Sequence, residues 1–255
     1  MEKITFSTAA LTQTQQRRHN EDCYDYLLIK DTGCWVVADG LGGHHGGEVA
    51  SKLAVESIIA SFQQRPEVSA AAIHRYLEAA QQSLLSRQQE ETRLSEMGTT
   101  VVLLVADEQA AMWGHIGDSR LYHLRRGRIA NQTRDHSVSQ ALANAGEIKP
   151  EEVRFHEDRH RLLRALGQED NFRPVITQNH QPLEIGDAFL LCTDGFWELV
   201  LEAEMQADFN AAINPQDWLE KMQKRIIARS LKNPDRKHDN FTALAVCTQK
   251  SDYSA

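Results

Sequence analysis

Four aspartates stand at the ends of short apolar segments that have the composition of β-strands. They are Asp39 after WVVA, Asp118 after HIG, Asp194 after FLLCT, and Asp239 just before NFTALAV. Taken singly, an aspartate at such a position is most often a turn residue. Taken together, four strand-end carboxylates can converge on one edge of a β-sandwich, where they would repel one another. A hard divalent cation relieves that repulsion, and an oxygen-only ligand set indicates Mg²⁺ or Mn²⁺.

The glycine-rich stretch VVADGLGGHHGGE, residues 36–48, allows two other interpretations. A dinucleotide fingerprint fits Gly40 and Gly42 but has His45 in place of its third glycine, and a Walker loop would need Gly-Lys-Ser/Thr at its end. His44 and His45 diverge by about 100° on a helix, so they cannot share a metal ion as histidines four residues apart can. We expect both to be loop or helix-start residues. In the remaining interpretation, a carboxylate metal site, the carbonyl of Gly40 can approach the ion because no Cβ intervenes.

The stretch RRHNED adds a cation to this picture. Arg17 and Asp22 precede the first predicted strand, and they reach the same edge if that strand pairs with Cys34–Ala38. A guanidinium beside a carboxylate site for two metal ions is suited to binding a phosphate group.

The elements that must position these residues are mostly short strands joined by tight turns. Such connections predict hairpins and antiparallel sheets. The predicted strands are Tyr24–Lys30, Cys34–Ala38, Thr99–Ala106, Ala110–Ile116, Arg120–Leu124, Arg128–Gln132, Val175–Asn179, Ala188–Cys192 and Phe241–Cys247.

Helical patterns lie before and after this block of strands. Residues 47–65 and 68–91 carry apolar stripes at helical spacing, with Pro66 between them, and a further helical block covers about 202–231. Within it, Asn214 and Pro215 stand at cap and first-turn positions. The order indicates sheets covered by helices on both faces, and a single domain over residues 1–255.

Composition excludes several classes of protein. The 255 residues include 25% charged and 41% hydrophobic side chains, as in ordinary globular proteins, and the net charge of −8 argues against a nucleic-acid or anionic-membrane surface. The four cysteines are scattered, with no C-x-x-C pair, which indicates free thiols in a reducing compartment. With no signal-peptide pattern and no apolar run of about 18 residues, the sequence predicts a cytoplasmic protein.

Eight motifs occur in an order that resembles the metal-dependent PP2C-type (PPM) protein Ser/Thr phosphatases. They are RRHNED, ADGLGGHHGGE, GTTVV, GHIGDSRLY, TRDHS, LLRALG, CTDGFWE and HDNFTALAV, and they span about residues 17–246. The form DGLGGHHGGE is similar to the bacterial branch. The resemblance implies an α+β fold: a sandwich of two antiparallel β-sheets flanked by helix pairs on both faces, with the metal ions at one end.

The resemblance also implies a ligand set for two tightly bound Mn²⁺ or Mg²⁺ ions. Asp39, Asp194 and Asp239 would hold the first ion. Asp39 and the carbonyl of Gly40 would hold the second.

Further positions follow from the same motifs. Asp22, with Glu21 as a second candidate, would lie in the water shell of the ions, and Arg17 would bind the substrate phosphate. Asp118 would join Asp194 in holding a third, weaker ion.

Two segments depart from the commoner pattern. Residues 137–161 match the flap that shapes substrate access, but carry HEDRH at 156–160 instead of HPxRN. Leu41 stands where animal relatives have a histidine proposed as the general acid. The acid is therefore a metal-bound water or His44, and we favour water.

The predicted activity is direct hydrolysis of phosphoserine and phosphothreonine by a water between two metal ions, without a phosphoenzyme. The sequence lacks the C-x5-R, D-x-D and G-D-x-H-G motifs of other phosphatases. A regulator that recognises phosphoproteins without turnover is the alternative from another class, and p-nitrophenyl phosphate hydrolysis with Mn²⁺ separates the two. The expected partner of this monomer is a phosphorylated protein, such as a cognate Ser/Thr kinase or one of its targets.

Overall fold

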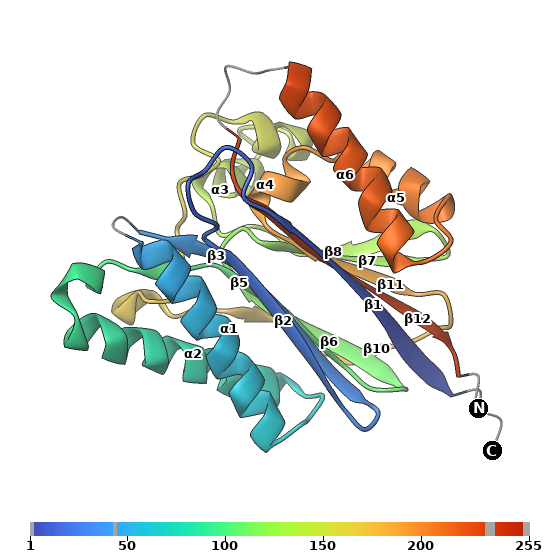
Figure 1. The fold of residues 1–255 in the computed structure, drawn as a ribbon, viewed down its shortest axis with the longest axis horizontal. Coiled ribbons are helices and arrows are strands. Elements are labelled where there is room, and N and C mark those ends of the chain that lie inside the picture. Colours follow the sequence, from blue (N-terminus) through green and yellow to red (C-terminus); the bar gives the residue numbers. More distant parts are fainter. Residues whose placement is uncertain (1–2, 43–44, 233–237, 252–255) are drawn as a thin grey trace.

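Two antiparallel β-sheets pack face to face, and a pair of helices covers the outer face of each (Figure 1). The structure is a computed structural model that describes residues 3–42, 45–232 and 238–251. This architecture confirms the predicted α+β sandwich.

The first sheet, called sheet A, has the strand order β1-β12-β11-β7-β8. Each pair of neighbouring strands in this sheet is antiparallel. Its strands are β1 (Ile4–Gln13), β12 (Phe241–Lys250), β11 (Ala188–Cys192), β7 (Arg120–Arg125) and β8 (Arg128–Gln132).

The second sheet, called sheet B, has the order β10-β6-β5-β3-β2, with β4 paired to β3 and β9 to β6. Its strands are β2 (Asp22–Ile29), β3 (Thr32–Leu41), β4 (Gly98–Thr99), β5 (Val101–Ala106), β6 (Ala110–Ile116), β9 (Val175–Ile176) and β10 (Gln181–Pro182).

Helices α1 and α2 lie over sheet B, and α5 and α6 lie over sheet A (Figure 1). The helices are α1 (Gly46–Gln64), α2 (Ala70–Glu90), α3 (Val138–Ala145), α4 (Asp194–Trp197), α5 (Glu202–Asn210) and α6 (Pro215–Lys232). Three short 3-10 turns complete the set: η1 (Thr92–Leu94), η2 (Pro150–Phe155) and η3 (Glu169–Asn171). None of the described helices is long and apolar enough to cross a membrane.

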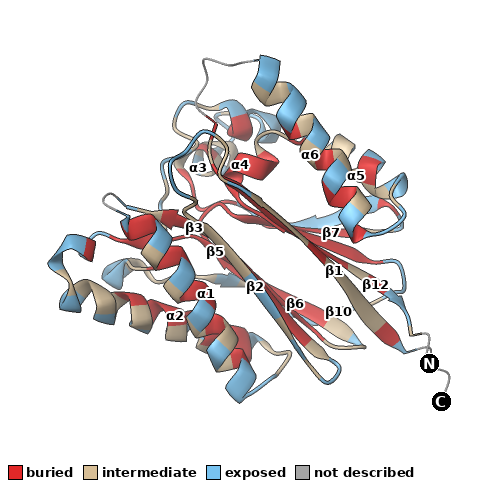
Figure 2. Ribbon diagram, in the orientation of Figure 1, coloured by how far each residue is buried: buried red, intermediate tan, exposed pale blue. Residues whose placement is uncertain are grey.

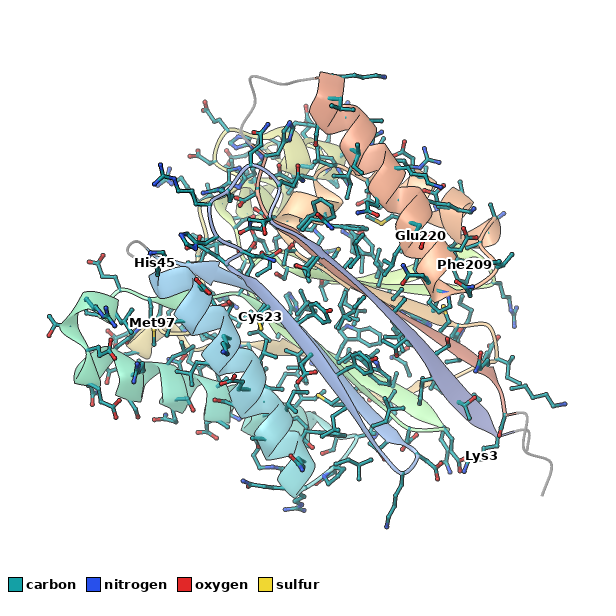
Figure 3. The ribbon with its side chains drawn as sticks, in the orientation of Figure 1. Lys3, Cys23, His45, Met97, Phe209 and Glu220 are labelled. Carbon is teal, nitrogen blue, oxygen red and sulfur yellow. The ribbon has the colours of Figure 1, made fainter. Side chains whose placement is uncertain are left out.

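The central strands are buried on both faces, which explains their nearly continuous apolar sequences (Figure 2). On β3, Cys34 and Val36 pack under α1 and α2, whereas Trp35 and Val37 pack between the two sheets. A third cluster fills the space between sheet A and its helices. In Figure 3, Cys23 marks the cluster below α1, and Phe209 marks the one below α5 and α6.

Most predicted elements are present, with shifted ends. The segment Thr99–Ala106 divides into β4 and β5, and Val175–Asn179 forms a strand only at its first two residues. The late helical block divides into α5 and α6, and Asn214 begins α6 by accepting a hydrogen bond from the backbone N–H of Asp217 at 2.8 Å. Strand β1 was not predicted. Its sequence ITFSTAALTQ has no strong apolar pattern, and its strand geometry depends on pairing with β12 along its whole length.

Candidate metal centre

A cavity of about 380 Å³ opens where the C-terminal end of β3, the β6–β7 turn, the end of β11 and the start of β12 meet. Four predicted aspartates and the predicted arginine surround it. The lining residues are Arg17, Glu21, Asp39, Gly40, Leu41, Gly42, Asp118, His160, Leu162, Asp194 and Asp239. The fold therefore brings together side chains that lie up to 222 positions apart in the chain.

Asp22 is not among the residues that line this cavity. It is directly opposite Asp39 in the pairing of β2 with β3, and its carboxylate accepts a hydrogen bond from the Thr193 hydroxyl at 2.9 Å. Burial raises the pKa of Asp22 to about 8, against the lowering effect of its hydroxyl hydrogen bonds. Burial also raises the pKa of Asp39 well above its ordinary value, and the charges of the neighbouring aspartates add to the effect.

Asp39 is held through its backbone. Its carbonyl accepts hydrogen bonds from the Thr100 N–H and the Thr99 hydroxyl, both at 2.8 Å, and its own N–H donates to the Thr100 hydroxyl at 3.1 Å. These contacts fix the end of β3 without using the Asp39 carboxylate, which stays available for a cation.

Close backbone packing also requires glycine at position 40, in addition to the expected approach of its carbonyl to an ion. A Cβ at this position would lie 2.1 Å from the carbonyl oxygen of Gly47 and 2.7 Å from that of Glu21, so backbone atoms on both sides exclude any side chain. The β3 end, the RRHNED loop and the start of α1 can pack this closely only around glycine.

Asp194 and Asp239 each have a basic partner. Asp239 accepts a hydrogen bond from the Arg17 guanidinium at 2.5 Å and another from the Asn240 N–H at 2.8 Å. Asp194, at the start of α4, lies 3.2 Å from Nδ1 of His160. Arg17 thus stands at the cavity already bound to one predicted metal ligand.

Asp118 occupies a tightly held turn. The residue before it, Gly117, has φ +102°, and its N–H donates to Nδ1 of His136 at 3.1 Å. The indole N–H of Trp197 donates to the Asp118 carbonyl at 2.9 Å. Burial raises the pKa of Asp118 well above its ordinary value, and the charges of Asp194 and Asp135 act in the same direction.

His160 is the site residue that the sequence argument missed. Its ring joins Asp194 and Glu198 in a group of three potential metal donors, and Arg159 holds Glu198 at 2.7 Å. The sequence signal for His160 is the HEDRH segment, which differs from the common HPxRN pattern at this position. Leu41 and Leu162 form apolar walls of the cavity. The alternative general acid, His44, lies outside the described residues.

The donor set fits hard divalent cations. Carboxylates that share a buried cavity oppose one another's ionisation, and a divalent cation among them would relieve both the repulsion and the desolvation. Asp39, Asp118, Asp194 and Asp239 offer oxygen only, the donor that Mg²⁺ and Mn²⁺ prefer. The fold and the site together define a metal-dependent phosphate-ester hydrolase.

Comparison with known proteins agrees with this class. Residues 12–233 match the family described as Protein phosphatase 2C. The serine/threonine phosphatase stp of Listeria innocua is 32% identical over 74% of this chain and 77% of its own length. The protein phosphatase PhpP of Streptococcus pneumoniae is also 32% identical, over 77% of this chain and 81% of its own. The chain belongs to the protein phosphatase 2C family.

A solved structure of similar fold is described with metal ions bound. The catalytic domain of the serine/threonine protein phosphatase PstP, described in complex with two manganese ions, superposes with a TM-score of 0.82 at 26% identity. The match covers 97% of this chain and 100% of that one. The predicted family, fold and enzyme class, a metal-dependent protein serine/threonine phosphatase, are confirmed.

Proposed function

We propose that this chain hydrolyses phosphoserine and phosphothreonine in proteins by direct attack of water on phosphorus, with Mn²⁺ or Mg²⁺ as cofactor. The observation that carries the proposal is the convergence of four aspartates and Arg17 on one cavity. When bound, two such ions would supply a water acidified at neutral pH and stabilise the charge on the phosphoryl oxygens.

Each aspartate has a proposed place in this centre. Asp39, Asp194 and Asp239 hold the first ion, and Asp39 with the Gly40 carbonyl holds the second. Asp22 acts through ordered water, which agrees with its place opposite Asp39 but outside the cavity lining. Asp118 with Asp194 holds a third, weaker ion.

Arg17 binds the substrate phosphate in this proposal. Its hydrogen bond to Asp239 uses one of five guanidinium N–H donors, so the others remain for phosphate oxygens. The same bond holds the side chain at the cavity before substrate arrives, which lowers the entropy cost of binding.

The leaving seryl oxygen needs a proton. Leu41 lines the cavity and has none to donate, so we assign this step to a water ordered at Asp118.

Residues 1–255 act in this proposal as one PP2C-type domain, with residues 137–161 as its flap. His160 supports the flap assignment, because it belongs to this segment and lines the cavity. Arg154 is buried and pairs with Glu202 at 2.5 and 2.6 Å, which anchors the segment to α5. The partner is a phosphorylated protein, such as a Ser/Thr kinase or its targets, and the chain acts as a monomer in the cytoplasm. The net charge of −8 and four free cysteines support this setting.

The test is hydrolysis of p-nitrophenyl phosphate and of a phosphoserine peptide, each with Mn²⁺, with Mg²⁺ and after removal of metal with EDTA. We expect turnover of both substrates only with added metal. Binding of the phosphopeptide without turnover would instead identify a regulator, and full turnover in EDTA would remove the metal assignment.

A further inference from the structure

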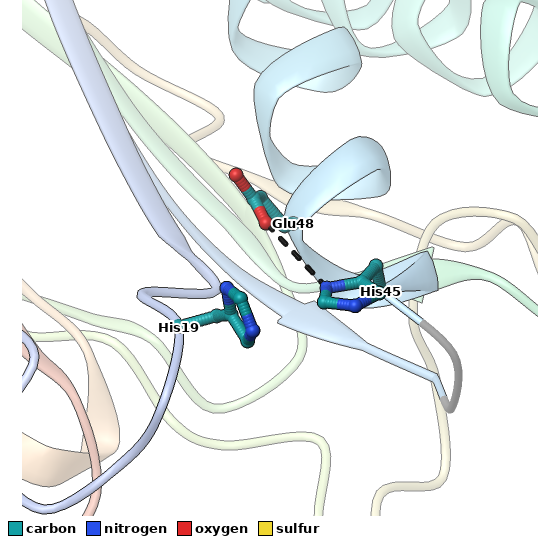
Figure 4. Close-up of side chains that lie close together, drawn as sticks. All are labelled: His19, His45 and Glu48. Carbon is teal, nitrogen blue, oxygen red and sulfur yellow. Dashed lines mark ion pairs between the residues drawn. The ribbon is translucent and has the colours of Figure 1, made fainter.

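A second group of metal-ligating side chains lies beside the catalytic cavity but does not line it. His19 comes from the loop between β1 and β2, His45 is the residue before α1, and Glu48 lies in the first turn of α1. Figure 4 shows the three side chains converging from these two segments. One donor atom from each lies within 4.8 Å of the others.

Backbone hydrogen bonds hold both histidines, His19 and His45, in place. The carbonyl of His19 accepts a hydrogen bond from the Asn240 side chain at 3.1 Å, which fixes the end of its loop. The carbonyl of His45 accepts from the Val49 N–H at 3.3 Å and so begins α1. The His45 backbone has φ 66°, a left-handed conformation that few residues other than glycine adopt.

The donor atoms of the three side chains are close enough to bind one ion after small side-chain rotations. The rings of His19 and His45 meet edge to face, with centroids 4.3 Å apart, and Nδ1 of His45 lies 3.9 Å from the Glu48 carboxylate. A tetrahedral Zn²⁺ with bonds of about 2.0–2.1 Å needs donors about 3.3 Å apart. Rotation of exposed side chains supplies the difference, since those of His45 and Glu48 are 60% and 52% accessible.

This donor set differs in kind from the catalytic one. Two imidazoles and one carboxylate favour a borderline ion such as Zn²⁺, whereas the cavity offers carboxylates. The N-terminal end of α1 opposes a cation there, and the acidic side chain of the nearby Glu21 favours one. His45 does not need its neighbour His44 as a second ligand, because it meets His19 from the loop between β1 and β2.

We propose that His19, His45 and Glu48 form a site for one Zn²⁺ ion, separate from the aspartate centre, with a fourth position open to water. The ion would cross-link the start of α1 to the loop that carries Arg17. Its occupancy would therefore order that loop.

The experiment counts zinc on the full chain after saturation with Mn²⁺. Wild type should retain one more Zn²⁺ per chain at equilibrium dialysis than the double variant H19A/H45A. E48Q should weaken the extra site at least about tenfold. H74A is the matched control, because His74 is also exposed and lies 3.9 Å from a glutamate, Glu78, but without a second histidine in the group.

Hydrogen exchange provides a second readout that does not depend on activity. Zn²⁺ should slow exchange of the amides of residues 14–21 in wild type and in H74A, but not in H19A/H45A. Equal zinc counts in wild type and the double variant, or an equal loss in H74A, would overturn the proposal. A chain without phosphatase activity can still bind this zinc, so the two proposals fail independently.

Discussion

Asp22 and Asp39 are opposite each other on neighbouring strands, and neither has a basic side chain as its hydrogen-bond partner among the described residues. Like charges at directly opposed positions of a sheet are destabilising. Burial and this repulsion raise the pKa of both groups, so in the absence of metal the folded protein must take up protons on these carboxylates or bear their repulsion, and the ligand positions lower the stability of the apoprotein.

Asp39→Asn tests this relationship through two opposite effects. Turnover of p-nitrophenyl phosphate with Mn²⁺ should fall by several orders of magnitude, because Asp39 is assigned to both tight ions. In EDTA the free energy of unfolding should rise by up to about 1 kcal/mol, because the variant no longer has to protonate this buried carboxylate or place it against the charge of Asp22. Urea unfolding in EDTA measures the second effect.

Asp25→Asn is the control for that pair of measurements. Asp25 lies on the same strand, opposite Val36, and its side chain is exposed. It should change neither quantity. A less stable apoprotein in Asp39→Asn would contradict the repulsion.

Arg17→Ala should raise KM for phosphate substrates by roughly 10- to 100-fold, the value of a hydrogen bond to a charged group, and lower kcat less. The reason is that the substrate phosphate is charged in both ground and transition states. Arg18→Ala is the matched control, because Arg18 is exposed and does not line the cavity. Equal effects at both positions would indicate a general electrostatic role.

Asp118→Ala tests whether Asp118 only stabilises its turn or also takes part in the reaction. A seryl alkoxide leaves poorly without a proton, whereas p-nitrophenolate leaves well without one. The variant should therefore keep two tightly bound metal ions and lose far more rate on a phosphoserine peptide than on p-nitrophenyl phosphate. Rates on both substrates at saturating Mn²⁺, with a count of bound metal, check this. Equal losses on the two substrates would remove the proton-delivery role.

Trp197→Phe should reproduce a weaker form of that pattern. It removes the hydrogen bond to the Asp118 carbonyl but keeps an aromatic ring below the Arg120 guanidinium, which lies 3.4 Å from the indole centroid. We expect about a tenfold loss on the phosphopeptide, corresponding to about 1.4 kcal/mol, and little on p-nitrophenyl phosphate.

Trp218→Phe is the control for the indole bond. Trp218 is equally buried and donates to the Met205 carbonyl at 3.0 Å, in the core below α6. It should cost similar stability and leave the ratio of the two rates unchanged. A shift of that ratio in both variants would mean that general loosening of the core is responsible.

His136→Asn should reduce the sensitivity of the fold to acid. Burial lowers the pKa of His136 from 6.5 to about 3, and the charges of His115 and Arg164 act in the same direction. The folded protein therefore keeps the ring neutral, while the unfolded chain takes up a proton below about pH 6.5. The free energy of unfolding therefore decreases as the pH falls from about 6.5 toward 3, by at most about 1.4 kcal/mol per pH unit for this residue.

Urea unfolding at pH 6.5 and pH 5.5 measures that slope. The Asn Oδ1 can replace Nδ1 as acceptor for the Gly117 N–H, so stability at pH 7 should change little. The exposed His74→Asn should keep the wild-type slope. An unchanged slope in His136→Asn would show that the ring is protonated in the folded state.

The sequence by itself determined that the four aspartates of the cavity stand at strand ends, and which strands carry them. Each of Asp39, Asp118, Asp194 and Asp239 adjoins an apolar segment whose burial on both faces follows from its composition. Local pattern is enough for such positions, because a strand end is defined by the residues on either side of it. The order of the motifs then supplied the family.

Only the tertiary structure decided which side chains meet. Arg17 reaches Asp239 because β1, a strand with almost no sequence signal, pairs with β12 along ten residues and sets the RRHNED loop beside the start of β12. His160 reaches Asp194, 34 positions along the chain, and His19 reaches His45, because the fold brings separate segments together. The packing of the two sheets fixes the positions of the segments that make these contacts. A local pattern of residues cannot give the distance between two segments that only this packing brings together.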